Sequence, residues 1–508
     1  MTVDRACRRV AAGVVRIVPA AVAVLLLLGA GSARAGDRER WFRMGFTPFN
    51  YDITDEAQQE VYDLINPRQD VIAHQVDGGV PWVELEAGEP YQQDVEDDLA
   101  TRLSSTPPGM TIYLATTPLN PGRDDLANYW GEDKNLPRPG EWANRTFDDP
   151  ETIAAYLDWC RDLLDRFHPR YFNYAMESVE LAHNAPEKWD SFMGLVRGVY
   201  PVLKREYPAV EIFVSITLRD SGTPEMEELR PYIDEVMAYS DMMTVSTYRY
   251  IFGSGPDKGD PANLPPDWLS QAVDMAPDKP FAVAETGWLA ENLSIPEWDL
   301  YVEGNPTWQD EYLETLLEES DRLGARFTIW FLAVDYDRLY WWLVLTGQAT
   351  PEWLLWKDTG LWDGNVVPRP SLDTWEAWKA LPRVPVPPPV PGGAWAGEQV
   401  TVSRAGGDEL TVTWDATTCP AEGYHLEWLD LAAFPDYRVV GETCEAGTTG
   451  SWTGTPPPGD ALGVLVVGDD GATLEGTHGR DSAGRERPTR STACTFTRKL
   501  TDGTCGGP

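Results

Sequence analysis

The chain has 508 residues, of which 42% are hydrophobic and 24% charged, and a formal net charge of −40 at pH 7. This length leaves room for two or three domains with sizeable hydrophobic cores. The strong negative charge argues against nucleic acids and anionic membrane surfaces as partners, because both require a basic protein surface.

The first 35 residues have the pattern of a secretory signal peptide. They carry five arginines and one aspartate, and they include an apolar run at 18–28 and the small-residue cleavage motif Ala33-x-Ala35. The apolar run is shorter than the roughly 20 residues that a membrane span needs, and no second long apolar stretch follows. We therefore expect a soluble protein, secreted to the extracellular or periplasmic space.

Between residues 41 and 332, eight short apolar runs rich in β-branched and aromatic residues alternate with helix-like segments. The runs predict strands at 41–47, 71–76, 111–116, 171–176, 211–216, 242–247, 281–285 and 327–332. The segments that follow them predict helices at 55–65, 91–103, 150–167, 187–207, 224–239, 266–275, 307–323 and 371–381. No tight hairpin turn joins two of these strands, so parallel pairing with crossover helices is expected.

At 37–381 this α/β pattern predicts a (β/α)8 TIM barrel. An open doubly wound sheet is the alternative, and the lack of a Gly-x-Gly-x-x-Gly after the first strand disfavours it. The helix at 150–167 shows the pattern well: Asp149 suits the N-cap, Pro150 suits the first helical position, and apolar residues repeat every three or four positions. Cys160 lies in that apolar stripe, which predicts a buried structural thiol.

A proline-rich segment at 382–393 predicts a stiff linker between the barrel and a second domain at 394–508. Short β-type runs in the second domain predict a small all-β sandwich, at 399–406, 409–416, 424–431, 436–442 and 461–471. The string LTVTWDA, which includes Trp414, makes this domain resemble the fibronectin type III-like modules of exported bacterial enzymes.

Cysteines cluster in the second domain, at Cys419, Cys444, Cys494 and Cys505, and predict two disulfides. Three pairings are possible, and we favour the sequential one, Cys419 with Cys444 and Cys494 with Cys505. The chain shows neither Cys-x-x-Cys spacing nor a histidine cluster, so the sequence predicts no metal site and no cofactor.

Two glutamates stand where a barrel enzyme carries its chemistry, at the C-terminal ends of the strands. Glu177 directly follows the fourth predicted strand, and Glu285 directly follows the seventh. These strand ends face each other across the barrel mouth, so the carboxylates could approach to the roughly 5–5.5 Å used by retaining glycosidases. One would attack the anomeric carbon, and the other would protonate the leaving oxygen and then activate water.

This layout resembles the clan A glycoside hydrolases. The string ETGW at 285–288 is similar to the seventh-strand motif of endo-β-1,3-glucanases, and endo-β-1,4-galactanases place their nucleophile similarly. The resemblance implies that Glu285 is the nucleophile and Glu177 the acid/base. It also implies that Tyr248 bonds the nucleophile and that Trp330 forms the floor of a sugar subsite.

One position departs from the clan pattern. The clan usually has asparagine immediately before the acid/base, where it bonds the 2-hydroxyl of the sugar, and here that position is Met176. Either Asn173 or another donor substitutes, or Glu180 is the acid instead, or catalysis is impaired. We favour Glu177 over Glu180, because Glu177 directly follows the apolar run of the strand.

Further side chains after the strands are candidates for substrate binding. His74 and Asp77 could line the cleft or form a structural hydrogen-bonded pair, while Trp82 and Trp288 could stack on a sugar face. The sequence thus predicts a secreted, monomeric, retaining glycoside hydrolase that acts on β-linked glycans without a metal. The alternative is a non-catalytic carbohydrate-binding protein built on a decayed barrel, which Met176 favours.

Overall fold

The computed structural model describes residues 39–255, 257–384, 390, 398–418, 420–434, 437–479, 487, 493–494, 496 and 498–499. The predicted signal peptide at 1–35, most of the predicted linker, Cys419 and Cys505 lie outside these ranges. Every helix within them is too short or too polar to span a bilayer.

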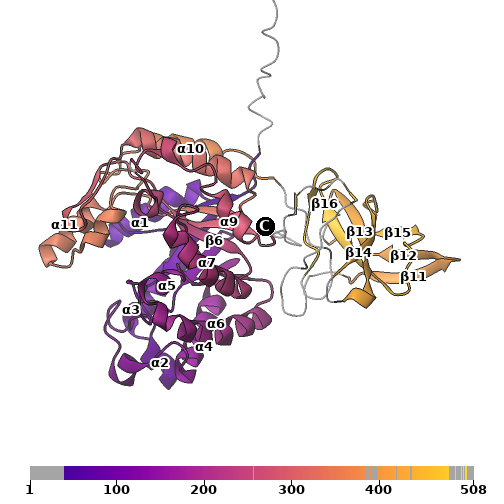
Figure 1. Cartoon of the computed structure of the whole chain (residues 1–508), viewed down its shortest axis with the longest axis horizontal. Coiled ribbons are helices and arrows are strands. Elements are labelled where there is room, and N and C mark those ends of the chain that lie inside the picture. The colour runs from indigo at the N-terminus through magenta and orange to yellow at the C-terminus, as the bar shows by residue number, and fades with distance from the viewer. Residues whose placement is uncertain are drawn as a thin grey trace, which may run out of the picture. The chain divides into compact units, whose positions relative to one another are not determined.

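The first domain is a closed barrel of eight parallel strands, as the sequence predicts (Figure 1). Its strands follow one another around the ring in chain order, and the last one, β10, pairs with β1 to close it. They are β1 (Arg43–Phe46), β2 (Val71–Val76), β3 (Thr111–Thr116), β4 (Tyr171–Ala175), β5 (Glu211–Thr217), β6 (Met243–Thr247), β7 (Phe281–Thr286) and β10 (Phe327–Trp330).

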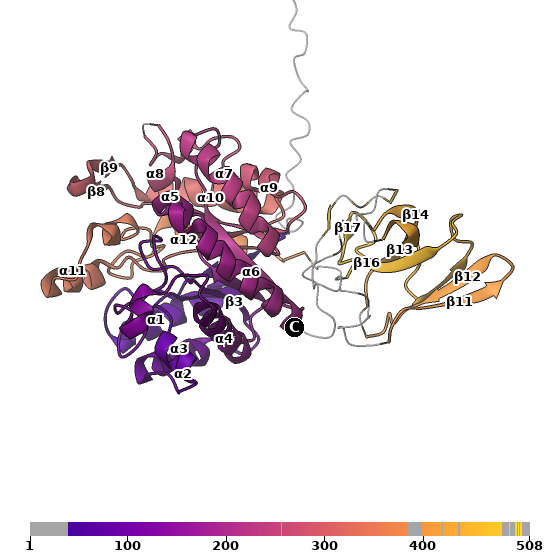
Figure 2. The same ribbon diagram turned by 60° about the horizontal axis from the view of Figure 1, so that its bottom comes forward.

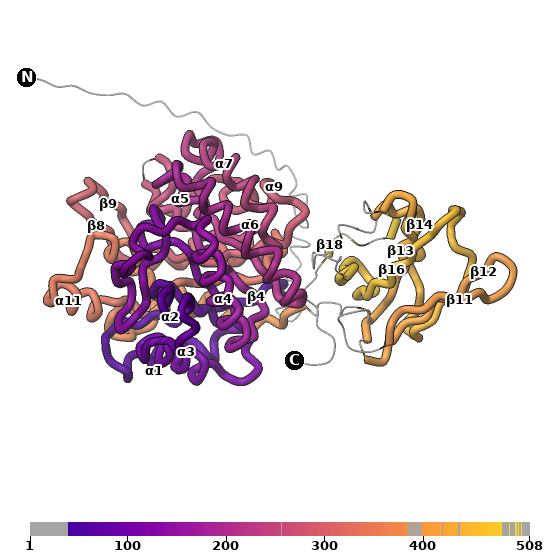
Figure 3. The backbone as a smooth tube through the Cα atoms, turned by 90° about the horizontal axis from the view of Figure 1, so that it is seen from below, coloured from indigo at the N-terminus to yellow at the C-terminus, as the bar shows by residue number. Residues whose placement is uncertain are grey.

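All eight predicted helices are present around the barrel. They are α1 (Asp55–Ile65), α3 (Gln93–Ser105), α4 (Pro150–Phe167), α6 (Trp189–Glu206), α7 (Pro224–Val236), α9 (Ser270–Met275), α10 (Pro306–Arg322) and α12 (Pro370–Lys379). Neighbouring helices pack against each other, as α4 and α6 do in Figures 2 and 3. Further helices lie between these elements: α2 (Trp82–Ala87), α5 (Glu180–Asn184), α8 (Arg249–Phe252) and α11 (Asp337–Thr346).

Helix α4 illustrates how local sequence sets these elements. It begins at Pro150, as predicted, but the Asp149 side chain accepts a hydrogen bond from the Thr146 backbone N–H (2.8 Å) and does not cap the helix. Cys160 is fully buried in the apolar stripe, and burial raises the pKa of its thiol. The prediction of a buried structural thiol is therefore confirmed.

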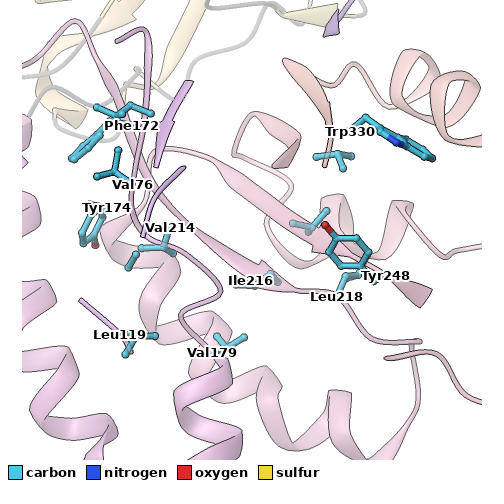
Figure 4. Packing of buried hydrophobic residues seen from close by; sticks show 14 of the residues in the cluster. Val76, Leu119, Phe172, Tyr174, Val179, Val214, Ile216, Leu218, Tyr248 and Trp330 are labelled. Atoms are coloured by element: carbon cyan, nitrogen blue, oxygen red, sulfur yellow. The ribbon is translucent and has the colours of Figure 1, made fainter. Parts of the chain in front are cut away.

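Strand side chains alternate between two hydrophobic layers. On β5, Val214 and Ile216 face outward, among the buried residues shown in Figure 4, whereas Phe213 faces the barrel interior. Inside, the ring of Tyr113 stacks against Phe213 and Phe327 at centroid distances of 5.8 and 5.0 Å. These aromatic rings therefore pack inside the barrel, below the strand ends.

Two insertions enlarge the C-terminal face of the barrel. A hairpin of β8 (Leu293–Ile295) and β9 (Leu300–Val302) follows β7, and α11 follows β10. Figures 2 and 3 show the hairpin and α11 on the same side of the barrel domain. Because both insertions start from C-terminal strand ends, they belong to the face where a barrel enzyme keeps its site.

The second domain contains two separate β-sheets. One has the order β11 (Thr401–Gly406), β12 (Glu409–Thr413), β15 (Ser451–Gly454); the other has β14 (Val439–Thr443), β13 (Gly423–Asp430), β16 (Leu462–Asp469), β17 (Leu474–Glu475), β18 (Arg498–Lys499). Val412, Trp414, Leu426 and Trp428 share one buried core. The five predicted strands are present; β15, β17 and β18 were missed, because runs of two to four residues carry little pattern.

The disulfide between described residues of this domain differs from the sequential pairing. Cys444 is bonded to Cys494, with their Cα atoms 5.2 Å apart. The backbone N–H groups of Ala493 and Cys494 donate to the carboxylate of Glu442 on β14, so this late segment returns to the edge of the sheet next to Cys444. The sequential prediction was wrong because the pairing follows from this long-range return, which spacing along the chain does not reveal.

Replacing both bonded cysteines, as in C444A/C494A, should lower the free energy of unfolding of the second domain by about 3–4 kcal/mol. The bond joins residues separated by 50 positions, and releasing such a loop enlarges the entropy of the unfolded chain. Urea unfolding checks the loss, with C160A as a control that perturbs only the barrel. Peptide mapping without reductant should yield the Cys444–Cys494 peptide, and a Cys419–Cys444 peptide instead would contradict the pairing.

Candidate active site

Glu285 lies at a break in the regular pairing of β7. Between Val283 and Glu285 the strand shifts by one residue against β6, and a matching shift occurs against β10. A bulge of this kind re-aims side chains next to active sites. It lets Ala284 face the interior cluster while the next residue, Glu285, still points into the barrel mouth.

Two side chains hold the Glu285 carboxylate. The Tyr248 hydroxyl, just after β6, donates to Oε1 at 2.5 Å, and the Gln75 amide of β2 donates to Oε2. Strands β2 and β7 are not neighbours in the ring, so the bond from Gln75 crosses the barrel mouth. Glu285 is therefore fixed from its own side of the barrel and from the far side.

Glu177 follows β4 in a strained but well-supported turn. Its φ of +51° lies in the left-handed region, which few non-glycine residues adopt. Its backbone N–H donates to the Ser215 hydroxyl (3.0 Å), and the same oxygen accepts from the Asn173 amide (3.0 Å). β4 also shifts by one residue against β5 between Asn173 and Ala175. A polar layer beneath the mouth thus positions Glu177.

Arg123 forms an ion pair with Glu177. Its Nη2 and Nε lie 3.2 and 3.3 Å from Glu177 Oε2, and both side chains are only about one-fifth exposed (17% and 21%). Arg123 also has a left-handed φ of +52°, and its guanidinium donates to the Asn120 carbonyl (3.2 Å). A positive charge is therefore built into the mouth beside the two carboxylates.

The charges of the site act on one another. Burial, and next the negative charge of Glu177, raise the pKa of Glu285 to about 7. The hydrogen bonds from Tyr248 and Gln75 and the charge of Arg123 act in the opposite direction. Near neutral pH Glu285 is thus partly protonated, and a carboxylate pair of this kind can divide acid and base roles.

The alternative acid, Glu180, is engaged elsewhere. It lies at the start of α5 and accepts two hydrogen bonds from Arg219, at 2.6 and 3.0 Å, in an ion pair that is almost fully buried. Removing a carboxylate from such a pair would leave an uncompensated buried charge. The possibility that Glu180 replaces Glu177 is therefore wrong.

Asn173 and Met176 do not take the place of the clan asparagine. Both amide hydrogens of Asn173 are used, toward the Tyr113 hydroxyl (3.1 Å) and the Ser215 hydroxyl, and its side chain is fully buried. Met176 belongs to the hydrophobic cluster of the barrel interior. Asn173 is therefore a positioning residue, and the prediction that it binds substrate is wrong.

Four predicted substrate contacts have no exposed surface at all: His74, Trp82, Trp288 and Trp330. The His74 ring bonds the Thr106 hydroxyl (2.8 Å), and the three indole N–H groups donate to the carbonyls of Ala127, Gly259 and Thr359. A side chain without accessible surface cannot stack on a sugar, so these four predictions are wrong. Asp77 is exposed, and its role in substrate binding stays a prediction.

On β2, the prediction chose His74, which lies on the outward face of the strand. Ala73 faces the barrel interior, so by strand alternation Gln75 also faces in and His74 faces out, against Phe167 of α4. Burial there lowers the pKa of His74 to about 3. Gln75 was missed because it is uncharged, although the alternation of the strand pointed to it.

The same alternation applies at the end of β10. Ile329 faces the interior, Trp330 faces outward against Tyr312 of α10, and Phe331 turns toward the mouth. The Phe331 ring lies 6.5 Å from that of Tyr248 and 6.2 Å from that of Trp356. The aromatic side chain that β10 offers to the site is therefore Phe331.

No family model matches the chain, and no curated protein matches its sequence. Similar solved structures include a β-glucuronidase of Bacteroides uniformis, at 13% identity and a TM-score of 0.39, which covers 85% of this chain and 46% of that one. The chain thus spans less than half of that enzyme.

Two further neighbours are shorter proteins. The GH53 catalytic domain of Ignisphaera aggregans is 16% identical with a TM-score of 0.42, and the match covers 67% of this chain and 91% of that one. Xylanase 10B of Thermotoga maritima is 11% identical with a TM-score of 0.45, and the match covers 67% and 94%. These neighbours are glycoside hydrolases, and the likeness concerns the fold alone.

Replacing Glu285 with glutamine should stabilise the protein at alkaline pH. The folded pKa of about 7 exceeds the ordinary 4.5, so the folded state binds this proton more tightly, and stability falls as pH rises from 4.5 through 7. E285Q removes that penalty and should melt a few degrees higher than the parent at pH 8, with no difference near pH 4. Thermal melts across pH check this, with E89Q at an exposed position as the control.

Proposed function

We propose that the chain is a retaining glycoside hydrolase acting on β-linked glycans, with Glu285 as nucleophile and Glu177 as general acid/base. The observation that carries the proposal is the convergence of these two carboxylates, from β4 and β7, on one mouth, where the charge of Glu177 raises the pKa of Glu285. The choice of β-glycans rests on the resemblance of the ETGW string. The signal-peptide-like pattern at 1–35 supports the proposal that the enzyme acts outside the cytoplasm.

The proposed reaction is a double displacement. Glu285 attacks the anomeric carbon while Glu177 gives its proton to the leaving glycosidic oxygen, and a covalent glycosyl–enzyme forms. Glu177, now ionised, takes a proton from water, and that water displaces Glu285 from the sugar. Tyr248 and Gln75 each hold one oxygen of Glu285, so the carboxylate stays aimed through both steps.

The resting state needs a proton shift before this reaction. Without substrate, Arg123 pairs with Glu177, and the raised pKa of Glu285 keeps Glu285 partly protonated at neutral pH. The first step requires the opposite distribution. Bound sugar must therefore draw Arg123 away from Glu177 so that Glu177 can receive the proton.

A second function, binding without cleavage, is favoured by two observations. Met176, and not an amide side chain, directly precedes Glu177, and Arg123 already engages the Glu177 carboxylate in an ion pair. Purified protein tested against β-glucans, galactans, mannans and xylans separates the two functions. Release of reducing ends supports hydrolysis, and retention on a glycan without release favours the binding protein.

Azide rescue on an activated aryl β-glycoside of the responsive sugar tests the two roles. E285A should lose at least a thousandfold in turnover, and azide should restore activity with an α-glycosyl azide as product, because azide then replaces the missing nucleophile in a single inversion. E177A should still form the glycosyl–enzyme, because the leaving group needs no acid, and azide should give the β-glycosyl azide. If E285A gave the β-glycosyl azide and E177A the α-glycosyl azide, the two roles would be exchanged. E89Q is the control for the loss of a carboxylate elsewhere.

Replacing Arg123 with glutamine should move the pH–activity profile to higher pH. The positive charge of Arg123 lowers the pKa of Glu285, so its loss raises that pKa above 7 and lets the pair keep its last proton at higher pH. The basic limb of kcat/KM should shift accordingly. R230Q removes one exposed arginine of α7 and should leave the limb in place. An unmoved limb in R123Q would contradict the role given to this charge.

A further inference from the structure

The second domain buries polar side chains on the face of its five-stranded sheet that lies opposite the hydrophobic core. On β13, Leu426 and Trp428 belong to the core, so by strand alternation His425 and Glu427 face the other side. Both are nevertheless fully buried, with no exposed surface. Burying imidazole and carboxylate groups away from water costs free energy unless they are paired or bind a metal ion.

Four metal-binding side chains converge there. His425 and Glu427 come from β13, Glu475 comes from β17, and His478 follows four positions after the start of β17. One ligand atom from each lies within 4.8 Å of all the others. Every one of the four side chains is at most 3% exposed.

The distances match a small tetrahedral ion. His478 Nε2 lies 3.0 Å from Glu427 Oε1 and 3.8 Å from Glu475 Oε2, and His425 Nε2 lies 3.3 Å from Glu475 Oε2. Two ligands that each sit about 2.0 Å from a tetrahedral zinc ion are about 3.3 Å apart. Three of the six pairs of ligand atoms are thus near this spacing, and the cluster as a whole, within 4.8 Å, would contract around such an ion.

Outer contacts orient one of the imidazoles. His425 Nδ1 lies 3.0 Å from Asp469 Oδ2 on β16, so an N–H at Nδ1 can donate to this carboxylate and leave the Nε2 lone pair aimed at the cluster. Metal-binding histidines are commonly held in this way by a carboxylate. The Phe496 ring stacks on His425 at 4.4 Å and covers the group from one side.

From this convergence we propose that His425, Glu427, Glu475 and His478 bind a structural zinc ion in the second domain. Two imidazole nitrogens and two carboxylate oxygens suit zinc, whereas calcium prefers six to eight oxygen ligands. All four ligands come from the protein and are buried, which is typical of a structural site. The ion ties β13 to β17 across β16, independently of the function of the barrel.

The competing occupant of the cluster is a proton. Although burial lowers the pKa of His425, its contacts with Asp469 and Glu475 raise it to about 9. Without metal, His425 would therefore be an imidazolium ion between carboxylates. A metal ion replaces that proton, so uptake of zinc by the purified protein distinguishes the two states directly.

Metal uptake by the full chain, with any affinity tag removed, tests the proposal. After treatment with chelator and dialysis, added zinc should bind with one equivalent per chain and raise the melting temperature of the second domain. Cobalt(II) in its place should give the intense visible absorption of a tetrahedral site. Failure of the parent protein to take up either ion would overturn the proposal in favour of the protonated cluster.

Variants of the four proposed ligands test whether zinc binds at this cluster. H425Q and H478Q should each weaken zinc binding at least a hundredfold, E427Q provides a third ligand variant should either misfold, and D469N should weaken binding about tenfold without changing the stoichiometry. H183Q, at an exposed histidine of α5, should bind zinc like the parent. Circular dichroism verifies that each variant is folded. Undiminished binding by folded H425Q and H478Q would refute the site.

Discussion

The candidate active site depends on one costly arrangement, the Glu285 carboxylate held in the barrel mouth near the second carboxylate of Glu177. Burial and like charge both oppose its ionisation. Its neighbours offset that cost in part: Tyr248 and Gln75 donate one hydrogen bond to each oxygen, and Arg123 supplies a positive charge. The register shifts of β4 and β7 serve the same end, because they let the strand ends turn polar side chains inward without breaking the closed ring.

The barrel could be predicted because its pattern is local and repeated: apolar runs alternate with amphipathic segments, and each element carries its own period. The two glutamates could be predicted because strand ends are visible in such a pattern. Residue type alone, however, did not predict which side chains contact these glutamates. His74 and Trp330 looked suitable but face outward, whereas Gln75 and Phe331, one position later, face the mouth. The alternation of side chains along each strand was visible in the sequence, and it predicts which residues face the mouth better than residue type does.

Contacts that join distant parts of the chain were beyond the sequence for a different reason. Cys494 meets Cys444, and His478 meets Glu427, because β17, β18 and the described residues between them return to the five-stranded sheet. Neither pairing has a characteristic spacing, unlike the ligands of a zinc finger. Strands as short as β17 and β18 decide both returns, and such strands carry too few residues to show a period.

The Arg123–Glu177 ion pair distinguishes the two proposed functions, hydrolysis and binding without cleavage. In the proposed reaction Glu177 must reach the glycosidic oxygen, and here a guanidinium 3.2 Å away already engages its carboxylate. Met176 is packed into the interior, and Arg123 is the charged group paired with Glu177. A sugar hydroxyl that draws Arg123 onto itself would free Glu177 and bind the substrate by the same movement. In a protein that only binds, nothing would require this pair to open.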